Sequence, residues 1–310
     1  MGGRGLHYAE RVKLLVGIPT HRRPDMLREC LESVALQTGD LPDIEVFVAD
    51  NDTSAREGVA VVEDMKPSYR FPLSATTVAT PGISAVRNAI LTVARRREVD
   101  FIAMIDDDET ASANWLVQLL RVQSATQAGV VGGPVRQLFS DDVPEWFRIG
   151  FRRPLKSSGR TDLVDATGNV LLSCNALEAL GWPQFDHSYG LSGGGDTEYF
   201  LRVRQLGMRF GWAAEAVLSE TVEDERLSVK WILKRSYRHG IIRTRLKQNY
   251  HFEGTPGLAW AACNLAATPL LLLITAYPRF RIMALKRIAY AIGLIAGSFG
   301  MKYHEYASRH

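Results

Sequence analysis

The sequence predicts an α/β fold in which a mainly parallel sheet is covered by helices on both faces. Two observations lead to this fold class. Between residues 12 and 135, short apolar runs rich in β-branched residues alternate with longer amphipathic stretches, which is typical of βαβ units. Two of these apolar runs also end in aspartates, Asp50 and Asp106, and open α/β sheets bind ligands beyond the carboxyl ends of their strands.

Each element follows from its own pattern. Runs such as VKLLVGI predict strands, and apolar residues at helical spacing between them predict helices. The predicted strands cover residues 12–18, 44–50 and 100–106. The predicted helices cover residues 24–37, 85–97, 114–127, 196–206 and 227–248. Residues 140–195, rich in Gly, Pro, Ser and aromatic side chains, predict long loops with a few strands that face a substrate.

Length and composition limit the kind of protein. The 310 residues, 46% hydrophobic and 23% charged, suffice for one large domain with an appendage. The net charge of +3 is too small to indicate a nucleic-acid partner. Cys30, Cys174 and Cys263 lie far apart and in no CxxC spacing, so they predict no disulfide framework and no thiolate metal site, in keeping with a reducing cytoplasm.

The C-terminal part predicts contact with a membrane. Residues 257–277 carry no charge and are long enough for a bilayer span, and the apolar residues 282–300 contain Lys286 and Arg287. Two spanning helices would place the arginines at their tip outside the cytoplasm, against the positive-inside tendency. We therefore expect helices that lie in the membrane interface at its cytoplasmic side. A buried pair of helices is the alternative.

A basic segment precedes these apolar runs. Residues 226–250 contain eight Lys or Arg residues and no Asp or Glu. A solvated helix face is one interpretation. The position beside an apolar anchor favours the other, in which the segment attracts anionic lipid head groups or a substrate diphosphate. Arg238 and His239 are candidates for contact with the diphosphate.

Four consecutive acidic residues, 106–109, end the strand in FIAMIDDDETA. Adjacent carboxylates repel one another, so the stretch is either a solvated turn or a cation site. An EF-hand loop does not fit, because Ala111 stands where that loop needs Gly. The pattern Asp106-x-Asp108-x-Thr110 also resembles haloacid-dehalogenase phosphatases. That family needs a later acidic pair, and Phe200 stands where the second acid of the nearest candidate would fall.

The interpretation that fits the acidic stretch best is a DxD-type nucleotide-sugar site. Mg²⁺ and Mn²⁺ prefer a few carboxylates together with phosphate and water, which a short acidic strand end supplies. Such a cation would compensate the crowded negative charge and neutralise a departing diphosphate. The stretch therefore predicts Mn²⁺ or Mg²⁺ as the cofactor.

Several motifs, in order, resemble those of the family 2 glycosyltransferases of the GT-A fold, which is Rossmann-like. The resemblance extends over residues 12–211 and is strongest to transferases of the succinoglycan exopolysaccharide type, which add sugars to lipid-linked oligosaccharides. Besides the acidic stretch, the matching motifs are VGIPTHRRPDMLRECLESVALQ, VADNDTS, GISAVRNAIL and GGGDTEYFLR.

The resemblance implies roles for particular residues. Asp196 is the implied catalytic base, and Asp108 with Asp106 the implied metal ligands. The implied donor-binding residues are Pro19, Thr20, Arg22, Asp50, Asn51, Arg87, Asn88, Asp106 and Asp107. Weaker candidates for contact with the acceptor or the diphosphate are Trp182, Glu198, Arg238 and His239. One residue departs from the family pattern, because Gly195 stands where a Glu commonly precedes the base.

Local structure offers another explanation for several of these residues. Asp50 could close an Asx turn at the end of its strand. Arg87 and Asn88 could form an exposed first helical turn, and Asp196 could serve as a helix N-cap. The common order of the motifs, with acids at strand ends or helix starts, favours a site.

The resemblance thus implies an inverting, metal-dependent transfer from a nucleotide diphosphate sugar, with a UDP-sugar favoured, to a polyprenyl-diphosphate-linked saccharide. We expect a GT-A domain over residues 1–225, with a nucleotide-sugar half at 1–135 and an acceptor half at 136–225. Residues 226–310 would bind an anionic membrane surface at the cytoplasmic face of the inner (plasma) membrane. The alternatives are a non-catalytic sugar-nucleotide or glycan-binding subunit and the phosphatase.

Overall fold

A computed structural model describes residues 12–151, 154–190, 193–250, 256–267 and 278–301. The chain divides into two compact units. The first unit comprises Met1–Arg136, Leu155–Leu191 and Gly195–Glu220. The second unit comprises Gln137–Pro154, Ser192–Gly194 and Thr221–His310.

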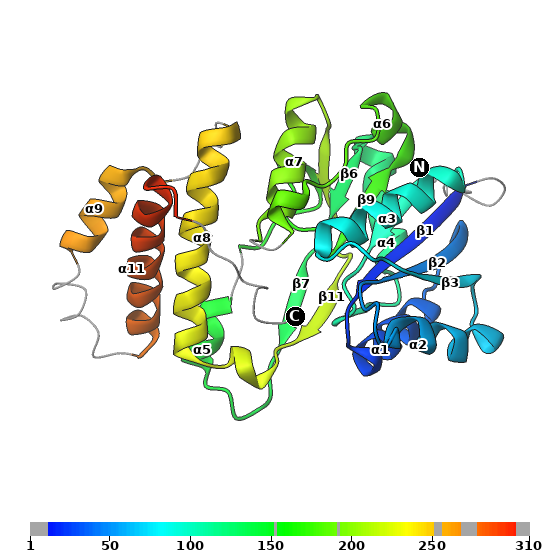
Figure 1. Cartoon of the computed structure of the whole chain (residues 1–310), viewed down its shortest axis with the longest axis horizontal. Coiled ribbons are helices and arrows are strands. Elements are labelled where there is room, and N and C mark those ends of the chain that lie inside the picture. Colours follow the sequence, from blue (N-terminus) through cyan, green and yellow to red (C-terminus); the bar gives the residue numbers. More distant parts are fainter. Residues whose placement is uncertain (1–11, 152–153, 191–192, 251–255, 268–277, 302–310) are drawn as a thin grey trace, which may run out of the picture. The chain divides into compact units, whose positions relative to one another are not determined.

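The described residues of the first unit form an eight-stranded sheet of order β3-β2-β1-β4-β9-β6-β10-β8 (Figure 1). Its strands are β1 (Lys13–Thr20), β2 (Asp43–Asp50), β3 (Leu73–Thr77), β4 (Phe101–Met104), β6 (Val130–Gly132), β8 (Gly159–Thr161), β9 (Val170–Ser173) and β10 (Phe210–Trp212). The pairs β1–β2, β1–β4, β2–β3 and β6–β10 are parallel. β9 runs antiparallel to both of its neighbours, and β8 runs antiparallel to β10. The predicted, mainly parallel α/β sheet is confirmed.

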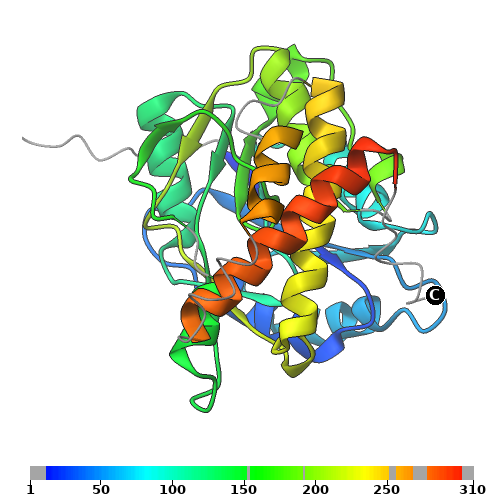
Figure 2. The ribbon, with the colours of Figure 1, turned by 90° about the vertical axis from the view of Figure 1, so that its left-hand side faces the viewer.

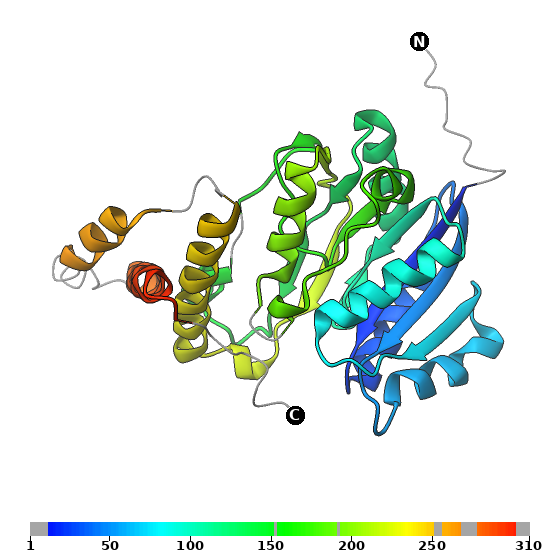
Figure 3. The same cartoon turned by 45° about the horizontal axis from the view of Figure 1, so that its top comes forward.

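Helices cover both faces of this sheet, as the alternation of buried side chains requires (Figure 3). In β1, Leu14 and Val16 belong to one apolar cluster and Leu15 to the other. The first cluster contains buried residues of α1 (Pro24–Ala35), α2 (Glu57–Met65) and α4 (Trp115–Thr126). The second contains buried residues of α3 (Ile83–Arg96), α6 (Cys174–Ala179) and α7 (Gly195–Gln205).

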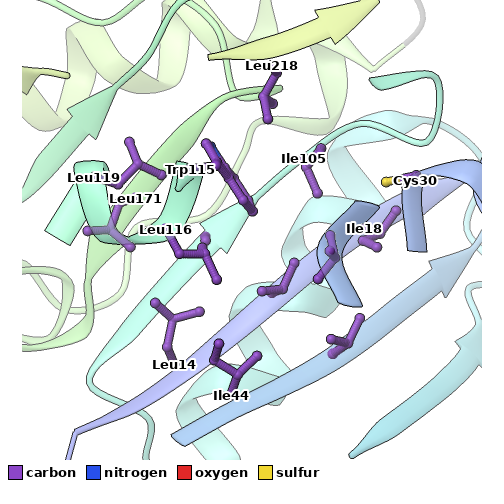
Figure 4. Packing of buried hydrophobic residues seen from close by; sticks show 14 of the residues in the cluster. Leu14, Ile18, Cys30, Ile44, Ile105, Trp115, Leu116, Leu119, Leu171 and Leu218 are labelled. Carbon is purple, nitrogen blue, oxygen red and sulfur yellow. The ribbon is translucent and has the colours of Figure 1, made fainter. Parts of the chain in front are cut away.

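The first cluster joins apolar side chains of the sheet to those of its helices (Figure 4). Leu14 and Ile44 come from adjacent strands, and Trp115 and Leu116 come from the start of α4. Trp115 is fully buried, and its indole nitrogen donates to Asn169 Oδ1 at 2.8 Å. This bond satisfies the one polar atom of the largest side chain in the cluster.

A second, smaller sheet adjoins the acidic stretch. Its order is β5-β11-β7, formed by Glu109–Ala111, Leu218–Thr221 and Val135–Leu138. β5 pairs with β11 in antiparallel register. The acidic residues therefore join β4 of the large sheet to β5 of the small one.

The predicted elements correspond to β1, β2, β4, α1, α3, α4, α7 and α8 with shifts of a few residues at their ends. The sequence predicted no element between residues 50 and 85, where the structure has α2 and β3. In β3 only Leu73 is buried, so its sequence lacks the alternation that marks a strand. Residues 140–195 contain the short elements β8, β9, α5 (Glu145–Arg148) and α6 among loops, as expected.

The second unit is helical, and its helices α8 (Val229–Tyr250) and α11 (Pro278–Ser298) pack against each other, with α11 crossing α8 (Figure 2). Glycines allow the close approach. A methyl group on Gly240 would lie 2.7 Å from the backbone nitrogen of Leu294, and Gly293 faces the carbonyl of Tyr237 in the same way. Thr244 Oγ1 donates to the Leu294 carbonyl at 3.2 Å. α9 (Leu258–Ala266) packs against α11.

None of the helices in the described ranges is both long and apolar enough to cross a bilayer. Of the apolar run predicted at 257–277, the structure describes α9, and residues 268–277 lie outside the described residues. In α11, Lys286 Nζ donates to the Gly150 carbonyl of the same unit, whereas Arg281 and Arg287 are exposed. Membrane association stays a prediction.

Candidate active site

The carboxyl ends of three adjacent parallel strands form the floor of the candidate site. The strand register pairs Thr20 of β1 with Asp50 of β2, and Gly17 of β1 with Met104 of β4. The acidic residues begin at Asp106, one residue after Ile105 and two after Met104. Parallel strands thus place the predicted nucleotide-binding and metal-binding segments side by side, as expected for a ligand site in an open α/β sheet.

Asp106 to Glu109 form a cluster of carboxylates, here called the acidic turn. Thr20 Oγ1 donates to Asp107 Oδ2 at 2.7 Å. The backbone nitrogen of Asp106 donates to Glu109 Oε2 at 3.2 Å. Gly168 lies against the same carboxylates, because a methyl group there would be 2.9 Å from Glu109 Oε1 and 3.0 Å from Asp106 Oδ2. The acidic turn is therefore closely packed against this glycine.

Burial raises the pKa of three carboxyl groups of the acidic turn. Removal from water, together with repulsion from neighbouring carboxylates, raises the pKa of Asp106 to about 7, although Arg87 lowers it. Burial raises the pKa of Asp107 to about 6 against the opposing hydrogen bond from Thr20. The pKa of Glu109 rises well above its usual value through burial and the charge of Asp106. The protein thus stabilises the ionised form of these three carboxyl groups less well than water does.

Two arginines neutralise part of this charge. Arg23 Nη1 donates to Asp108 Oδ2 at 2.7 Å and lies 3.4 Å from Asp107 Oδ1. Arg87, which is buried in the first turns of α3, places its Nη2 3.6 Å from Asp106 Oδ1. The Nε of Arg87 is buried without an acceptor among the described residues.

Arg87 also brings the predicted base to the acidic turn. Its Nη1 donates to Asp196 Oδ1, so one guanidinium joins Asp196 and Asp106. The other carboxylate oxygen of Asp196 accepts from the backbone nitrogen and the hydroxyl of Thr167, at 3.3 and 3.0 Å. Asp196 lies in the first turn of α7, where the helix dipole favours a carboxylate. Residues 20, 87, 106, 107, 108 and 196 therefore lie in one connected network.

The other predicted donor residues surround this network. Pro19 is buried in β1. Asp50 is fully buried, and its carboxylate accepts from the backbone nitrogens of Asp52 and Val59, as in the Asx turn considered above. The amide of Asn51 donates to the carbonyls of Val78 and Thr80. These contacts fix the loops beyond β2, and donor contact by Asp50 and Asn51 stays a prediction.

Arg22 and Asn88 have different surroundings. Arg22 is half-exposed and donates to Asp52 Oδ1 at 3.3 Å. Asn88 is buried and makes paired hydrogen bonds with the backbone of Phe185. Since Arg87 and Asn88 are both buried, the alternative of an exposed first helical turn is wrong.

The four weaker candidates come from a loop, from α7 and from α8. Trp182 is buried beside Arg95, about two helical turns along α3 from Arg87. Glu198 is buried in an ion pair with Arg202 at 2.9 Å. Arg238 and His239 belong to α8, in the second unit. Their contact with acceptor or diphosphate stays a prediction.

Sequence reasoning did not single out Arg23, Glu109, Thr167 or Gly168. Arg23 offered a signal, because an arginine beside Pro24 at a helix start is unusual. Glu109 was visible as the last acid of the run. Thr167 and Gly168 come from the loop-rich region 140–195, and no local pattern relates them to the acids.

The acidic turn fits a hard divalent cation. Its ligands are carboxylate oxygens, which such cations prefer, and a bound cation would stabilise the ionised form of the buried Asp106 and Asp107, whose pKa values burial raises. Across the described residues, no three His, Cys, Asp or Glu side chains converge on one point as a complete metal cage. A site here would use one or two carboxylates together with donor phosphates and water, as Mg²⁺ usually does.

The raised pKa values predict how stability depends on pH. An acid with a raised pKa binds its proton more tightly in the folded than in the unfolded state. Stability without added metal should therefore rise as the pH falls from above 7 toward 4, and decline as the pH rises through about 6 to 7. We expect thermal unfolding in EDTA at a temperature roughly 3 °C higher at pH 5.5 than at pH 8.

Two further measurements identify the groups responsible. Mg²⁺ or Mn²⁺ should raise the unfolding temperature more at pH 8 than at pH 5.5, because it favours the ionised carboxylates. The double variant Asp106→Asn, Asp107→Asn should lose most of the pH dependence that EDTA reveals. An undiminished dependence in that variant would assign it to other groups.

Comparisons with known proteins agree with this geometry. The model of the family described as Glycosyl transferase family 2 matches residues 15–181. The chain is 32% identical over 309 residues to the succinoglycan biosynthesis protein ExoM of Rhizobium meliloti (strain 1021), covering 97% of each chain.

Solved structures show the same fold at low sequence identity. The mannosyltransferase PcManGT from Pyrobaculum calidifontis, in complex with GDP-Man and Mn²⁺, has a TM-score of 0.65 at 16% identity, covering 94% of this chain and 89% of that one. S. aureus TarS 1–349 in complex with UDP has a TM-score of 0.54 at 17% identity, covering 94% and 93%. The GT-A-like fold is thus confirmed.

The family match spans more than half of the chain, and the ExoM relative is similar over nearly its whole length. The acidic turn, Arg87 and Asp196 lie in one network on that fold. The phosphatase hypothesis is therefore wrong, because both findings identify a glycosyltransferase. The chain belongs to the family 2 glycosyltransferases and is a glycosyltransferase similar to those of exopolysaccharide biosynthesis.

Proposed function

We propose that this glycosyltransferase moves a sugar from a nucleotide diphosphate sugar, with a UDP-sugar favoured, to a polyprenyl-diphosphate-linked saccharide in polysaccharide biosynthesis. Transfer inverts the anomeric centre, depends on Mn²⁺ or Mg²⁺, and takes place at the cytoplasmic face of the inner (plasma) membrane. The observation that carries the proposal is the Arg87 guanidinium, which joins Asp196 to Asp106. In a direct displacement the base and the diphosphate act on the same sugar, so Asp196 and the metal-binding carboxylates have to lie close to each other.

Asp196 is the proposed base. It accepts the proton of an acceptor hydroxyl as that oxygen attacks the anomeric carbon, and the bond to the diphosphate breaks with its electron pair. Arg87 and Thr167 hold both oxygens of the Asp196 carboxylate, which fixes its direction. One carboxylate serves a single displacement, so the anomeric configuration inverts and no covalent sugar intermediate forms.

The departing diphosphate needs positive charge. Arg87 has a buried Nε without an acceptor in the described part of the chain, which supports a role in binding an anionic donor. Asp108 and Asp106 would hold a Mn²⁺ or Mg²⁺ ion, which would neutralise the diphosphate as a Lewis acid. The similar fold of PcManGT, which was solved in complex with GDP-Man and Mn²⁺, supports this part of the proposal.

Other observations support the proposed acceptor and the proposed membrane contact. Similarity to a succinoglycan biosynthesis protein supports a growing saccharide as acceptor. In the second unit, α9 and α11 expose apolar side chains together with Arg281 and Arg287. The exposed apolar residues include Leu258, Met283, Ile292 and Phe299. Apolar and basic side chains exposed together favour contact with an anionic lipid surface.

A panel of nucleotide sugars tests the donor and the metal together. Thermal unfolding is measured for wild type with each nucleotide sugar, with and without Mn²⁺. The true donor should raise the unfolding temperature only when Mn²⁺ is present, because ligands that bind the folded state stabilise it. Asp108→Ala should abolish the response to Mn²⁺. The metal site would be contradicted if the donor raised the unfolding temperature equally with and without Mn²⁺. It would also be contradicted if Asp108→Ala kept the Mn²⁺-dependent rise.

Vesicle binding tests the membrane part. The protein should sediment with vesicles that contain phosphatidylglycerol, and the double variant Arg281→Gln, Arg287→Gln should reduce this binding roughly thirtyfold, at about 1 kcal/mol per basic residue. Leu36→Ser removes a similarly exposed apolar side chain from the first unit and serves as control. Binding equal to wild type in the double variant would mean that these arginines do not face lipid.

A further inference from the structure

Arg23 occupies a position that helix chemistry disfavours. It is the N-cap of α1 and makes no capping hydrogen bond through its side chain. Helix N-termini favour Ser, Thr, Asp or Asn, which accept hydrogen bonds, and their partial positive charge disfavours a cation. The preceding Arg22 has a φ of 53°, a left-handed conformation that is costly for a residue with a Cβ. The turn between β1 and α1 is thus less stable than it would be with a capping residue and an unstrained backbone.

The contacts of Arg23 give a reason for this cost. Its Nη1 lies 2.7 Å from Asp108 Oδ2 and 3.4 Å from Asp107 Oδ1. The exposed fractions of the three side chains are 24% for Arg23, 16% for Asp108 and 8% for Asp107. A short, charge-assisted bond with so little solvent around it is strong. Its acceptor, Asp108, is also the carboxylate proposed to hold the metal.

We propose that Arg23 is an internal counter-cation that makes metal binding at Asp108 depend on the donor nucleotide. This inference rests on the proposed metal-dependent function. A divalent cation alone has to compete with the guanidinium for Asp108 and therefore binds weakly. A donor diphosphate offers the cation further oxygen ligands and offers the released Arg23 an anionic partner. Cation and nucleotide then strengthen the binding of each other.

This role explains why an arginine stands at the N-cap. A shorter capping residue would stabilise α1 but would leave the acidic turn with Arg87 as its main counter-charge. With Arg23 in place, Asp107 and Asp108 have a cationic partner before any ligand arrives. Arg23 is in this sense a positioning residue, because it acts through Asp108 and the metal rather than on the reacting atoms.

Electron paramagnetic resonance of free Mn²⁺ tests the proposal without any turnover. Mn²⁺ is titrated into wild type, Arg23→Gln and Arg28→Gln, each with and without UDP, and the association of Mn²⁺ with UDP in protein-free solution is subtracted. Arg28→Gln is the matched control, because Arg28 lies on the same helix and pairs with the exposed Asp64 at 2.7 Å. Arg23→Gln should bind Mn²⁺ alone about tenfold tighter than wild type. The enhancement by UDP should shrink by a similar factor.

Each result decides the question. Equal or weaker binding of Mn²⁺ alone to Arg23→Gln, or an unchanged enhancement by UDP, overturns the counter-cation role. If wild type binds no Mn²⁺ even with UDP, the proposed metal dependence itself is wrong, and the inference falls with it. Arg23→Lys keeps the charge and the fold should Arg23→Gln unfold, and it should bind Mn²⁺ alone between the other two. An Arg23→Lys variant that binds Mn²⁺ alone no more tightly than wild type also rules the role out.

Discussion

Asp196→Asn should lower the rate of sugar transfer roughly thousandfold while leaving donor binding nearly unchanged. General base catalysis contributes about 10²- to 10⁴-fold, and an amide cannot accept the acceptor's proton. Asparagine keeps the size of the side chain and retains an oxygen that can accept from Thr167. The defect should therefore appear in kcat rather than in the KM for the donor. Transfer of radiolabelled sugar to membrane acceptors measures it.

The matched control is Glu178→Gln, which changes an exposed acid on α6 of the same unit and should leave transfer unchanged. Circular dichroism and the donor-dependent rise in unfolding temperature verify that the Asp196→Asn variant folds and binds. Near-normal turnover in a folded Asp196→Asn variant would show that another group takes the proton. The Arg87 bridge between Asp196 and Asp106 would then no longer support the proposed function.

Gly240→Ala should destabilise the second unit by about 3 kcal/mol, which corresponds to a fall of about 10 °C in its unfolding temperature. The new methyl group would lie 2.7 Å from the backbone nitrogen of Leu294 and 2.8 Å from the carbonyl carbon of Gly293. Both are backbone atoms, so neither can turn aside as a side chain would. Alanine has a higher helix propensity than glycine by about 1 kcal/mol, and the overlap outweighs this gain.

Gly257→Ala is the control for this prediction. Gly257 precedes α9 with a φ of −80°, and among the described residues, its two chain neighbours aside, no atom lies within 4 Å of the position its methyl group would take. Its unfolding temperature should stay within about 2 °C of wild type. A Gly240→Ala protein that is as stable as wild type, or more stable, would mean that α8 and α11 do not approach as closely as described.

Much of the first unit could be predicted because its signals are local. β1, β2 and β4 are short runs of buried residues, and α1 and α3, which lie between them in the chain, have apolar residues at helical spacing. The placement of acids at the ends of these strands needed only the rule that parallel strands end on one edge. Among the elements that escaped prediction, α2 and β3 lack such signals, since α2 contains β-branched valines and β3 buries only Leu73.

The site could be predicted only in part, because its decisive contacts join distant segments. Arg87 and Asp196 are separated by 109 residues, and Arg23 and Asp108 by 85. No local pattern shows that an arginine in a helix cap or in a first helical turn will meet a carboxylate so far along the chain. Thr167 likewise comes from a region whose fold depends on tertiary packing. Residue types at strand ends were thus visible in the sequence, whereas their partners were not.

The acidic turn is a short link between two sheets, since β4 ends at Met104 and β5 begins at Glu109. A link held at both ends by strand pairing has little freedom to rearrange, so its backbone is preorganised before a donor arrives. The entropy lost on binding should then come from Arg23, Arg87 and the ligand rather than from the turn. Amide hydrogen exchange at residues 105–109 should accordingly be slow in the free enzyme and change little when nucleotide is added.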